Sequence, residues 1–290
     1  MFELLLPFFL LVLFILFLFF IWRINARKYI SSVTVASAYD AWTQDKLLER
    51  LWGEHIHLGF YPLGTKNTDF RKAKIQFVHE LVKWSGLDKL PKGSRILDVG
   101  CGIGGSSRIL AKYYGFNVTG ITISPAQVKR ARELTPSKLS CNFQVMDALD
   151  LKFEDGSFDA IWSVEAGAHM NDKNKFADEM LRTLRPGGYL ALADWNSRDL
   201  NAYPPSFIEK LVLKQLLEQW VHPNFISIKE FANILRTNKN SAGIVNSENW
   251  NSFTNPSWFD SIFEGIRRPF TILSLGPLAI LKSIREIPTI

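Results

Sequence analysis

Four polar side chains, Asp98, Thr122, Asp147 and Glu165, stand where short apolar segments of the chain end. Such segments are typical of buried strands, and the carboxyl ends of parallel strands meet at one crevice of a doubly wound sheet. We therefore expect these side chains to line one ligand site. Asp98 directly precedes a glycine cluster, where a carboxylate would repel a pyrophosphate but can accept hydrogen bonds from a cationic, amine-bearing ligand.

His169 follows the fourth of these apolar segments and is the first candidate for a general base. The pKa of an imidazole lies near neutrality, which suits proton transfer at physiological pH. A purely structural histidine is the alternative at this position. Glu165 is a candidate to orient that base or to hold the amine of the ligand. His57, two residues after His55, is a further catalytic candidate in a segment that faces the substrate. No third ligand is spaced to join these two histidines, so no metal site is predicted.

The glycine cluster bears on the class of cofactor. Gly100, Gly102 and Gly105 match the dinucleotide pattern G-x-G-x-x-G, which is a weak signal when it stands alone. A dinucleotide site also needs an acidic residue about 20 positions further on for the ribose, and the chain offers Thr122 in that region. A nicotinamide dehydrogenase is therefore the less favoured interpretation. Cys101 is expected to be a small residue of the turn rather than a nucleophile.

Strands and helices alternate through the middle of the chain. The predicted strands cover 96–99, 117–123, 143–146, 158–163 and 189–194. The helices between them place apolar side chains on one face, with Ile109, Leu110 and Tyr113 in the first, a start at Ser124-Pro125 in the second, and Phe176, Met180 and Leu184 in the third. Pro186-Gly187-Gly188 is expected to turn the chain into the last of these strands. This alternation predicts an α/β fold with a doubly wound, mostly parallel sheet.

The flanking regions are less informative. Helical spacing is seen for Ile75, Val78 and Val82, for Ile208, Val212, Leu216 and Trp220, and over 231–235. A sixth strand is expected at 242–245, and no seventh, antiparallel strand is recognised before Ile290. The region after residue 195 either caps the sheet or lies against anionic lipid headgroups with apolar residues entering the bilayer.

Composition excludes several classes of protein. The net charge of +6 is scattered along the 290 residues, so a nucleic-acid partner is not expected. Two cysteines without a C-x-x-C pair encode neither a disulfide framework nor a zinc site.

The first residues predict a membrane anchor. Leu4 to Trp22 is a run of 19 residues without a charge, long enough to span the hydrocarbon core of about 30 Å. Arg23, Arg27 and Lys28 follow, which places the rest of the chain on the cytoplasmic side. A cleaved signal peptide is disfavoured because no basic residue leads the run. The expected organisation is then an anchor (1–23), a linker (24–38), a helical lid (39–92), a cofactor-binding core (93–200) and a substrate cap (201–290).

Several motifs resemble those of the cyanobacterial methyl-phytyl- and methyl-solanesyl-benzoquinol methyltransferases, and the γ-tocopherol methyltransferases are similar. The resemblance runs from about residue 30 to the end. It is carried by Tyr39-Asp40-x-Trp42-Thr43, Trp52-Gly53-Glu54-His55-Ile56-His57-Leu58-Gly59, the stretch from Asp98 to Ser107, 120–125, and Ser163-Val164-Glu165-Ala166-Gly167-x-His169-Met170. It implies a class I, Rossmann-like fold and methyl transfer from S-adenosylmethionine (SAM) to a ring carbon of a lipid-soluble prenylated quinol at the membrane bilayer, on the route to plastoquinone and tocopherol. Alternatives are methylation of γ-tocopherol, a sterol or another lipid, and a SAM-binding membrane adaptor without catalysis.

The resemblance and the strand-end positions together assign the SAM contacts. Asp98 is expected at the methionine ammonium, Thr122 and Gln127 at the ribose, and Asp147 at the adenine amino group, with Tyr39 closing over the carboxylate. The other expected cofactor contacts are Gly100, Cys101, Gly102, Gly104, Ile123, Ala148 and Ser163. The tocopherol enzymes carry Gly-Glu-His where this chain has Gly167-Ala168-His169, which leaves the exact quinol open.

Overall fold

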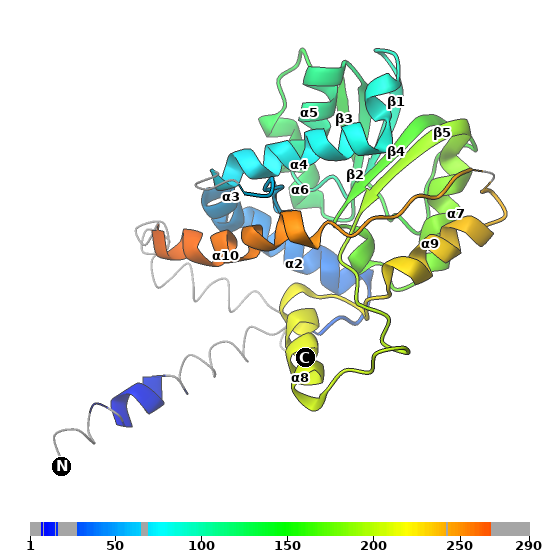
Figure 1. Ribbon diagram of the computed structural model, residues 1–290. Coiled ribbons are helices and arrows are strands. Elements are labelled where there is room, and N and C mark those ends of the chain that lie inside the picture. Colours follow the sequence, from blue (N-terminus) through cyan, green and yellow to red (C-terminus); the bar gives the residue numbers. More distant parts are fainter. Residues whose placement is uncertain are drawn as a thin grey trace.

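A computed structural model describes residues 7, 9–14, 16, 28–64, 69–241 and 243–267 (Figure 1). Its sheet has five parallel strands in the order β3-β2-β1-β4-β5. The strands are β1 (Arg95–Val99), β2 (Asn117–Thr122), β3 (Cys141–Val145), β4 (Phe158–Val164) and β5 (Leu184–Ala193). Chain order reverses between β1 and β4, which creates a ligand crevice at their carboxyl ends. The predicted doubly wound α/β fold is confirmed.

Helices cover both faces of the sheet, and the strand period of two decides which side chain meets which helix. On one face, Ile96 of β1 packs with α4 (Phe70–Ser85) and α5 (Gly105–Tyr114). On the other, Leu97 and Val99 pack with α7 (Lys173–Thr183) and α9 (Ile228–Thr237). Figure 1 shows these two pairs of helices on opposite sides of the strands. The remaining core elements are α6 (Pro125–Leu134) and the short turns η1 (Leu87–Lys89) and η2 (Gly167–His169).

Local signals predicted helix starts better than helix faces. Ser124 caps α6 as expected, because its hydroxyl accepts from the amide of Gln127. Ile75 and Tyr113, predicted on buried faces, are 39% and 58% exposed, since the buried stripes of α4 and α5 run past them. α7 ends at Thr183, so Leu184 belongs to β5 rather than to the helix. The expected turn at 186–188 lies inside β5, where the pairing with β4 shifts register.

The elements α2 (Ser32–Gln44), α3 (Leu47–Trp52), α8 (Phe207–Trp220) and α10 (Asn251–Arg267) gather beyond one end of the sheet (Figure 1). α2 crosses the predicted boundary between the linker 24–38 and the lid 39–92. α8 is helical as expected, but none of its residues is fully buried. Trp220 at its end packs against Trp42 and Trp52, whereas the first two turns of its apolar stripe lie away from the rest of the described protein. Ile208 and Val212 are therefore exposed rather than packed on the sheet.

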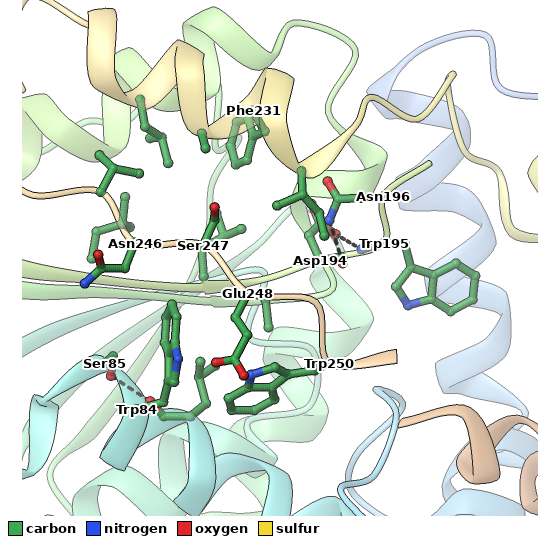
Figure 2. A pocket seen from close by; sticks show the side chains of 18 of the residues that line it. Trp84, Ser85, Asp194, Trp195, Asn196, Phe231, Asn246, Ser247, Glu248 and Trp250 are labelled. Atoms are coloured by element: carbon green, nitrogen blue, oxygen red, sulfur yellow. Dashed lines mark hydrogen bonds between the residues drawn. The ribbon is translucent and has the colours of Figure 1, made fainter. Parts of the chain in front are cut away.

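The expected sixth strand is not formed over the part of it that is described. Residues 243–250 are extended but unpaired, and the side chain of Ile244 is 91% exposed. A groove of about 1560 Å³ is bordered by this segment, β5 and α9. Figure 2 shows Asn246, Ser247 and Glu248 across it from Trp84 and Ser85 of α4. The backbone of this segment therefore makes no ladder with the edge strand.

Most of the predicted anchor, Leu4 to Trp22, lies outside the described residues. The part that is described, residues 7, 9–14 and 16, is helical and mostly exposed. No helix within the described ranges has both the length and the apolar character needed to cross a bilayer.

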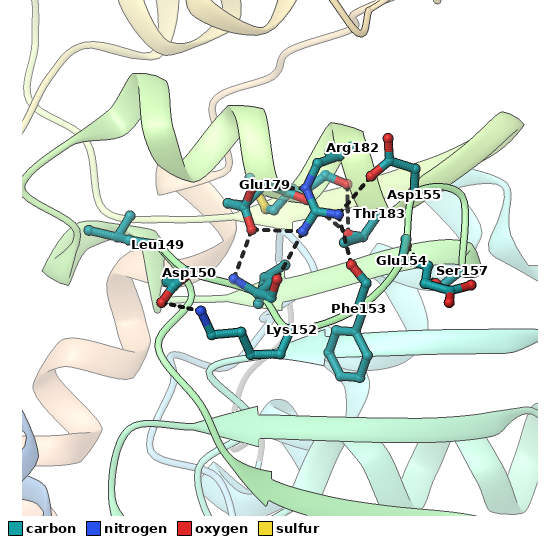
Figure 3. Close-up of polar contacts among 12 residues, drawn as sticks. Leu149, Asp150, Lys152, Phe153, Glu154, Asp155, Ser157, Glu179, Arg182 and Thr183 are labelled. Atoms are coloured by element: carbon teal, nitrogen blue, oxygen red, sulfur yellow. Dashed lines mark hydrogen bonds and ion pairs between the residues drawn. The ribbon is translucent and has the colours of Figure 1, made fainter.

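Arg182 ties the connection between β3 and β4 to α7 (Figure 3). Its guanidinium donates to the carbonyls of Leu151 and Phe153 and pairs with Glu179 and Asp155. Replacing Arg182 with Met is expected to lower the free energy of unfolding by about 1–3 kcal/mol, because two carbonyls and a partly buried carboxylate lose their donor.

Denaturant unfolding measures this change. The control is Lys152→Ala, which breaks an ion pair with Asp150 whose side chains are both largely exposed. That control should cost less than about 0.5 kcal/mol. Equal losses of unfolding free energy in the two variants would show that the hydrogen bonds and ion pairs of Arg182 do not hold the connection between β3 and β4.

Candidate active site

A cavity of about 320 Å³ lies at the carboxyl ends of the central strands. It is closed by α2, by residues 54–58 (the lid segment) and by aromatic side chains from the C-terminal third of the chain. Most of the predicted site residues line it: Tyr39, His57, Asp98, Gly100, Cys101, Gly102, Thr122, Ile123, Gln127, Asp147, Ala148, Glu165 and His169.

Two predicted cofactor contacts are not among the lining residues. Ser163 is fully buried within β4, and its hydroxyl donates to the carbonyl of Val99. Gly104 is the N-cap of α5, and a Cβ there would come within 2.7 Å of Phe143 and 2.9 Å of Arg108. The side of Gly104 where a side chain would stand is therefore filled by protein, and a contact of either residue with the cofactor stays a prediction.

Asp98 is a buried carboxylate at the floor of the cavity. The hydroxyl of Ser107 donates to its Oδ2 over 2.5 Å. Burial raises the pKa of Asp98 to about 7, and the hydrogen bond from Ser107 opposes the rise only in part. A cationic ligand would restore the charged form, since an opposite charge favours ionisation.

The turn after Asp98 brings backbone close to the ligand space. Gly100 has φ +78°, and a Cβ at this position would collide with Ala166. Only glycine satisfies both conditions. Burial raises the pKa of the Cys101 thiol well above its usual value, so the thiol stays protonated and is a poor nucleophile.

The expected ribose side is built at the start of α6. The hydroxyl of Thr122 donates to Oε1 of Gln127 over 2.6 Å, and both side chains are buried at the cavity wall. Asp40 of α2 accepts from the Ser124 hydroxyl and from the Ala126 amide at 3.0 Å. These bonds fix α2 to α6 and so place Tyr39 over the cavity.

His169 is held from two sides. Its Nδ1 lies 3.2 Å from the carbonyl of Val221, which can only accept, so Nδ1 carries the proton. Nε2 of the neutral ring then accepts from the Tyr39 hydroxyl at 2.8 Å. Burial lowers the pKa of His169 to about 4 and raises that of Tyr39. The pair is therefore neutral at pH 7, with the basic nitrogen directed at Tyr39.

Glu165 ends β4 in a strained backbone conformation, with φ +53°. Strain of this kind is concentrated at functional sites. Its Oε1 accepts from the Leu58 amide at 2.9 Å, which ties it to the lid segment. Burial raises the pKa of Glu165 to about 7, against the opposing effects of the Leu58 amide and the Trp195 indole. The group that orients His169 is Val221 rather than Glu165, contrary to one of our expectations.

The two histidines of the lid segment bind each other. His57 Nδ1 donates to the Leu58 carbonyl at 2.8 Å, so its Nε2 accepts from Nδ1 of His55 at 3.0 Å. Burial lowers the pKa of His57 to about 4 and holds that of His55 well below its usual value. No group of three or more metal-ligating side chains occurs in the described part of the chain. The imidazoles thus shape the cavity roof as neutral groups.

Two cations hold the lid segment in place. Arg108 of α5 pairs with Glu54 at 2.6 Å. The ammonium of Lys74, buried in α4, donates to the His55 carbonyl at 2.7 Å and lies over the rings of Phe70 and Trp52. Sequence reasoning missed both residues, because nothing in their local pattern distinguishes them from ordinary helix positions.

Sequence reasoning also missed the aromatic wall, which consists of Trp195, Trp220, His222 and Trp258. All four line the cavity. Trp195 and Trp258 pack with ring centroids 4.8 Å apart, and His222 stacks on His169 at 4.1 Å. The four residues come from two loops, the end of α8 and α10, so no sequence motif groups them. The richness of this region in tryptophan was the one available signal.

Comparisons with known proteins agree with this geometry. Residues 97–192 match the family model of a methyltransferase domain. The chain is 55% identical over 270 residues to a 2-methyl-6-phytyl-1,4-hydroquinone methyltransferase of Synechocystis sp., in an alignment that covers 93% of this chain and 85% of that protein. The chain belongs to the SAM-dependent methyltransferases. A chloroplastic tocopherol O-methyltransferase of Arabidopsis thaliana is 36% identical over 224 residues, 73% of this chain and 64% of that protein.

Solved structures show the same methyltransferase fold. The [4+2]-cyclase SpnF aligns with a TM-score of 0.70 and 24% identity, over 90% of this chain and 92% of its own. A putative sarcosine dimethylglycine methyltransferase from Galdieria sulphuraria aligns with a TM-score of 0.66 and 23% identity, over 84% of this chain and 89% of its own. Because a cyclase shares the fold, the reaction has to be argued from the site.

The cavity residues fit SAM. Asp98 is a buried carboxylate that accepts from the Ser107 hydroxyl and forms no ion pair with the described residues, and the SAM ammonium would supply the opposite charge. The bare backbone at Gly100 and Gly102 admits the methionine part, and polar groups at the ends of β2 and β3 can meet the nucleoside.

The SAM affinity of this methyltransferase is expected to depend on pH through Asp98. A cation prefers the carboxylate form, so below pH 7 binding must first remove a proton from Asp98. The dissociation constant should then rise by up to about tenfold per pH unit between pH 7 and 5. Calorimetry in buffers of different ionisation enthalpy measures both the affinity and the released proton. The Asp98→Asn variant should bind SAM weakly, with a dissociation constant that does not change between pH 7 and 5. If its dissociation constant still rises as in wild type, another group causes the pH dependence.

Proposed function

We propose that this methyltransferase transfers a methyl group from SAM to a ring carbon of a prenylated benzoquinol, 2-methyl-6-phytyl- or 2-methyl-6-solanesyl-benzoquinol, in tocopherol and plastoquinone biosynthesis. The observation that carries the proposal is the 55% identity, over 93% of the chain, to a hydroquinone methyltransferase. The aromatic wall supports it, since indole and imidazole rings complement a flat aromatic acceptor.

Bound SAM supplies an activated methyl group on a sulfonium sulfur, so the chain has to provide position and a proton acceptor. Holding both reactants in line removes several kcal/mol of entropic barrier. The floor of the cavity, with Asp98 and Gly100, fixes the donor side. The aromatic wall and the lid segment exclude water and hold the acceptor ring on the other side.

A ring carbon becomes a strong nucleophile when its ortho hydroxyl loses a proton. In our proposal Tyr39 passes that proton to Nε2 of His169, with which it already shares a hydrogen bond of 2.8 Å. The Val221 carbonyl stabilises the imidazolium that forms, because Nδ1–H stays bonded to it. The carbon–methyl bond then forms as the carbon–sulfur bond breaks and its electron pair goes to sulfur. Aromaticity returns when the methylated carbon releases its ring proton to solvent while the His169 imidazolium gives its proton back through Tyr39 to the ring oxygen, so that one proton is released per turnover and His169 is neutral again.

Glu165 and His57 have supporting roles in this proposal. Glu165 holds the lid segment through Leu58 and adds negative charge near the positively charged donor. His57, hydrogen-bonded to His55 in the cavity roof, faces the acceptor as an uncharged group. Of the predicted lid 39–92, the part up to residue 58 closes the cavity in this proposal, and of the predicted cap 201–290 the part that carries the aromatic wall does so. α4 and α9, which belong to the same two ranges, pack on the sheet with the SAM-binding core 93–200.

The proposed function is tested with purified full-length protein and methyl-labelled SAM. Methyl-phytyl-benzoquinol, methyl-solanesyl-benzoquinol and γ-tocopherol are offered in parallel in the same vesicles. The proposal expects label in the ring of one or both benzoquinols. Label in γ-tocopherol alone would make this a tocopherol methyltransferase, and no labelled lipid in the presence of SAM binding would favour a non-catalytic adaptor.

We also propose that the protein is anchored in a membrane by residues 1–23, followed by the linker 24–38, with the catalytic part on the cytoplasmic side. The uncharged run from Leu4 to Trp22 and the basic residues after it support this. The exposed face of α8 gives independent support, because Phe207, Ile208 and Val212 are 75%, 71% and 63% exposed. Large apolar residues exposed together on one helix face are typical of a surface that enters a lipid interface.

Cysteine probes test this contact in the full chain. Ile208→Cys and Val212→Cys, made on a Cys141→Ala background and labelled with a polarity-sensitive fluorophore, should shift to the blue on anionic vesicles. Tyr113→Cys, an exposed position on α5, is the matched control and should not shift. Equal spectra at all three positions would rule out α8 as a membrane contact.

A further inference from the structure

His222 carries a buried polar atom whose role the proposed chemistry leaves open. The residue is 7% exposed, and its Nδ1 has no hydrogen-bond partner within the described part of the protein. It lines the same cavity as Asp98 and His169. Leaving such a group unsatisfied costs about 1–3 kcal/mol, so each unsatisfied group in a folded protein calls for an explanation.

The surroundings of His222 are aromatic on several sides. Its ring stacks on His169 with centroids 4.1 Å apart and an interplanar angle of 24°. Phe225 meets it edge-on at 5.1 Å, and Trp195 lies tilted at 5.5 Å. A ligand whose polar group bonds Nδ1 would therefore have to be flat and apolar in the rest of its structure, because aromatic rings surround this position.

The chemistry of Nδ1 limits which ligand groups can form a hydrogen bond with it. In a neutral imidazole this nitrogen is either a lone pair or an N–H. Burial and the nearby His169 keep His222 neutral and lower its pKa to about 2, and the Ala168 backbone beside the ring opposes the shift only in part. A hydroxyl can both donate and accept, so it satisfies either tautomer, whereas an ammonium or a carbonyl satisfies only one.

We infer that the aromatic wall is the binding site for the acceptor ring, and that His222 Nδ1 hydrogen-bonds a phenolic hydroxyl of that ring. This inference rests on the proposed function and names the residue that recognises its acceptor. Because His222 stacks on His169, the ring is held beside the Tyr39–His169 pair that takes the proton. The expected selectivity is for free phenols over aryl ethers.

Three variants test the role of Nδ1 in the full-length protein. His222→Phe keeps a flat ring but removes the nitrogen. His222→Asn places an amide where Nδ1 was, and His222→Gln places one where Nε2 was. The KM for the quinol should rise about 10–100-fold in His222→Phe and His222→Gln, and should stay within about threefold of wild type in His222→Asn. The dissociation constant for SAM, measured by calorimetry, should not change in any of them.

A competitive inhibitor distinguishes the loss of the hydrogen bond at Nδ1 from a change in the shape of the acceptor site. A quinol analogue with both hydroxyls methylated cannot donate to Nδ1, and its crowded ether oxygens are weak acceptors for an Nδ1–H. Its inhibition constant should therefore be the same in wild type and His222→Asn and should change little in His222→Phe. The inference would be overturned if His222→Phe lost affinity equally for the free quinol and for the methylated analogue. A wild-type KM for the quinol in His222→Phe would overturn it as well.

The outcomes also separate this inference from the proposed function. If wild-type protein methylates no benzoquinol, the proposed function fails before His222 is tested. If wild type is active and the three variants share one KM, only the role of His222 fails. Should His222→Phe no longer bind SAM, the comparison of His222→Asn with His222→Gln decides by itself, and equal KM values in those two variants overturn the inference.

Discussion

Replacing Asp98 with Asn is expected to weaken SAM binding by about a hundredfold or more at pH 8, because the donor ammonium loses a desolvated carboxylate. The asparagine side chain has nearly the same shape as the aspartate and can still bond Ser107, so the loss reports charge rather than packing. Burial raises the pKa of Asp98 from 3.8 to about 7, so the carboxyl lowers the free energy of unfolding by an amount that grows between these two pH values and is fully present above pH 7. The variant without ligand should be as stable as wild type or more so.

Calorimetry and thermal unfolding with and without SAM check these two expectations together. Ser107→Ala is the matched control, since it removes one hydrogen bond from the carboxylate but leaves the charge. It should weaken SAM binding by only about 3–10-fold. A variant Asp98→Asn that binds SAM like wild type would remove Asp98 from the ammonium site.

The second large effect is expected for His169→Asn, with kcat for the quinol lower by about 10²–10⁴-fold. The introduced amide can replace Nδ1–H at the Val221 carbonyl but offers nothing at the position of Nε2. SAM binding should change by no more than about threefold, because His169 reaches the expected SAM contacts only through its hydrogen bond to Tyr39, and α2 is still fixed by Asp40. Tyr39→Phe should show a loss of the same order if the proton passes through the phenol.

The pH profile distinguishes His169 from Glu165 as the base. The pKa of His169 is about 4, so with SAM saturating, kcat should be flat between pH 6 and 8. The pKa of Glu165 is about 7, so a Glu165 base would make kcat rise across that range. Glu165→Gln is the paired variant, and it should lower kcat less than His169→Asn. A rising profile together with a larger loss in Glu165→Gln would make Glu165 the base.

Much of this site was predictable because it depends on the order of parallel strands. Asp98, Thr122, Asp147 and Glu165 each end an apolar run, and the topology of a doubly wound sheet brings such ends together. All four line one cavity in the structure. The turn glycines and the Ser124 cap follow from similarly local rules, since backbone conformation and capping depend on a few neighbouring residues.

Other features depend on contacts between distant segments. The partners of His169 are Tyr39, 130 residues away, and Val221, 52 residues away. The aromatic wall, the buried Lys74 and the exposed face of α8 likewise arise from packing that periodicity does not encode. The same holds for 243–250, which borders a groove at the edge of the sheet instead of pairing with it.

Strand period and turn chemistry are local properties, so the amino-acid sequence was enough to place the sheet, its glycine turn and the strand-end polar groups. The direction and the neighbours of each side chain depend on packing between distant segments, which is visible only in the folded protein. Ser163 shows the difference, since it belongs to a predicted motif yet is fully buried within β4, where its hydroxyl donates to the carbonyl of Val99. His222 shows the converse, since it belongs to no motif and is placed in the site by the packing of α8 and its following loop against the end of the sheet.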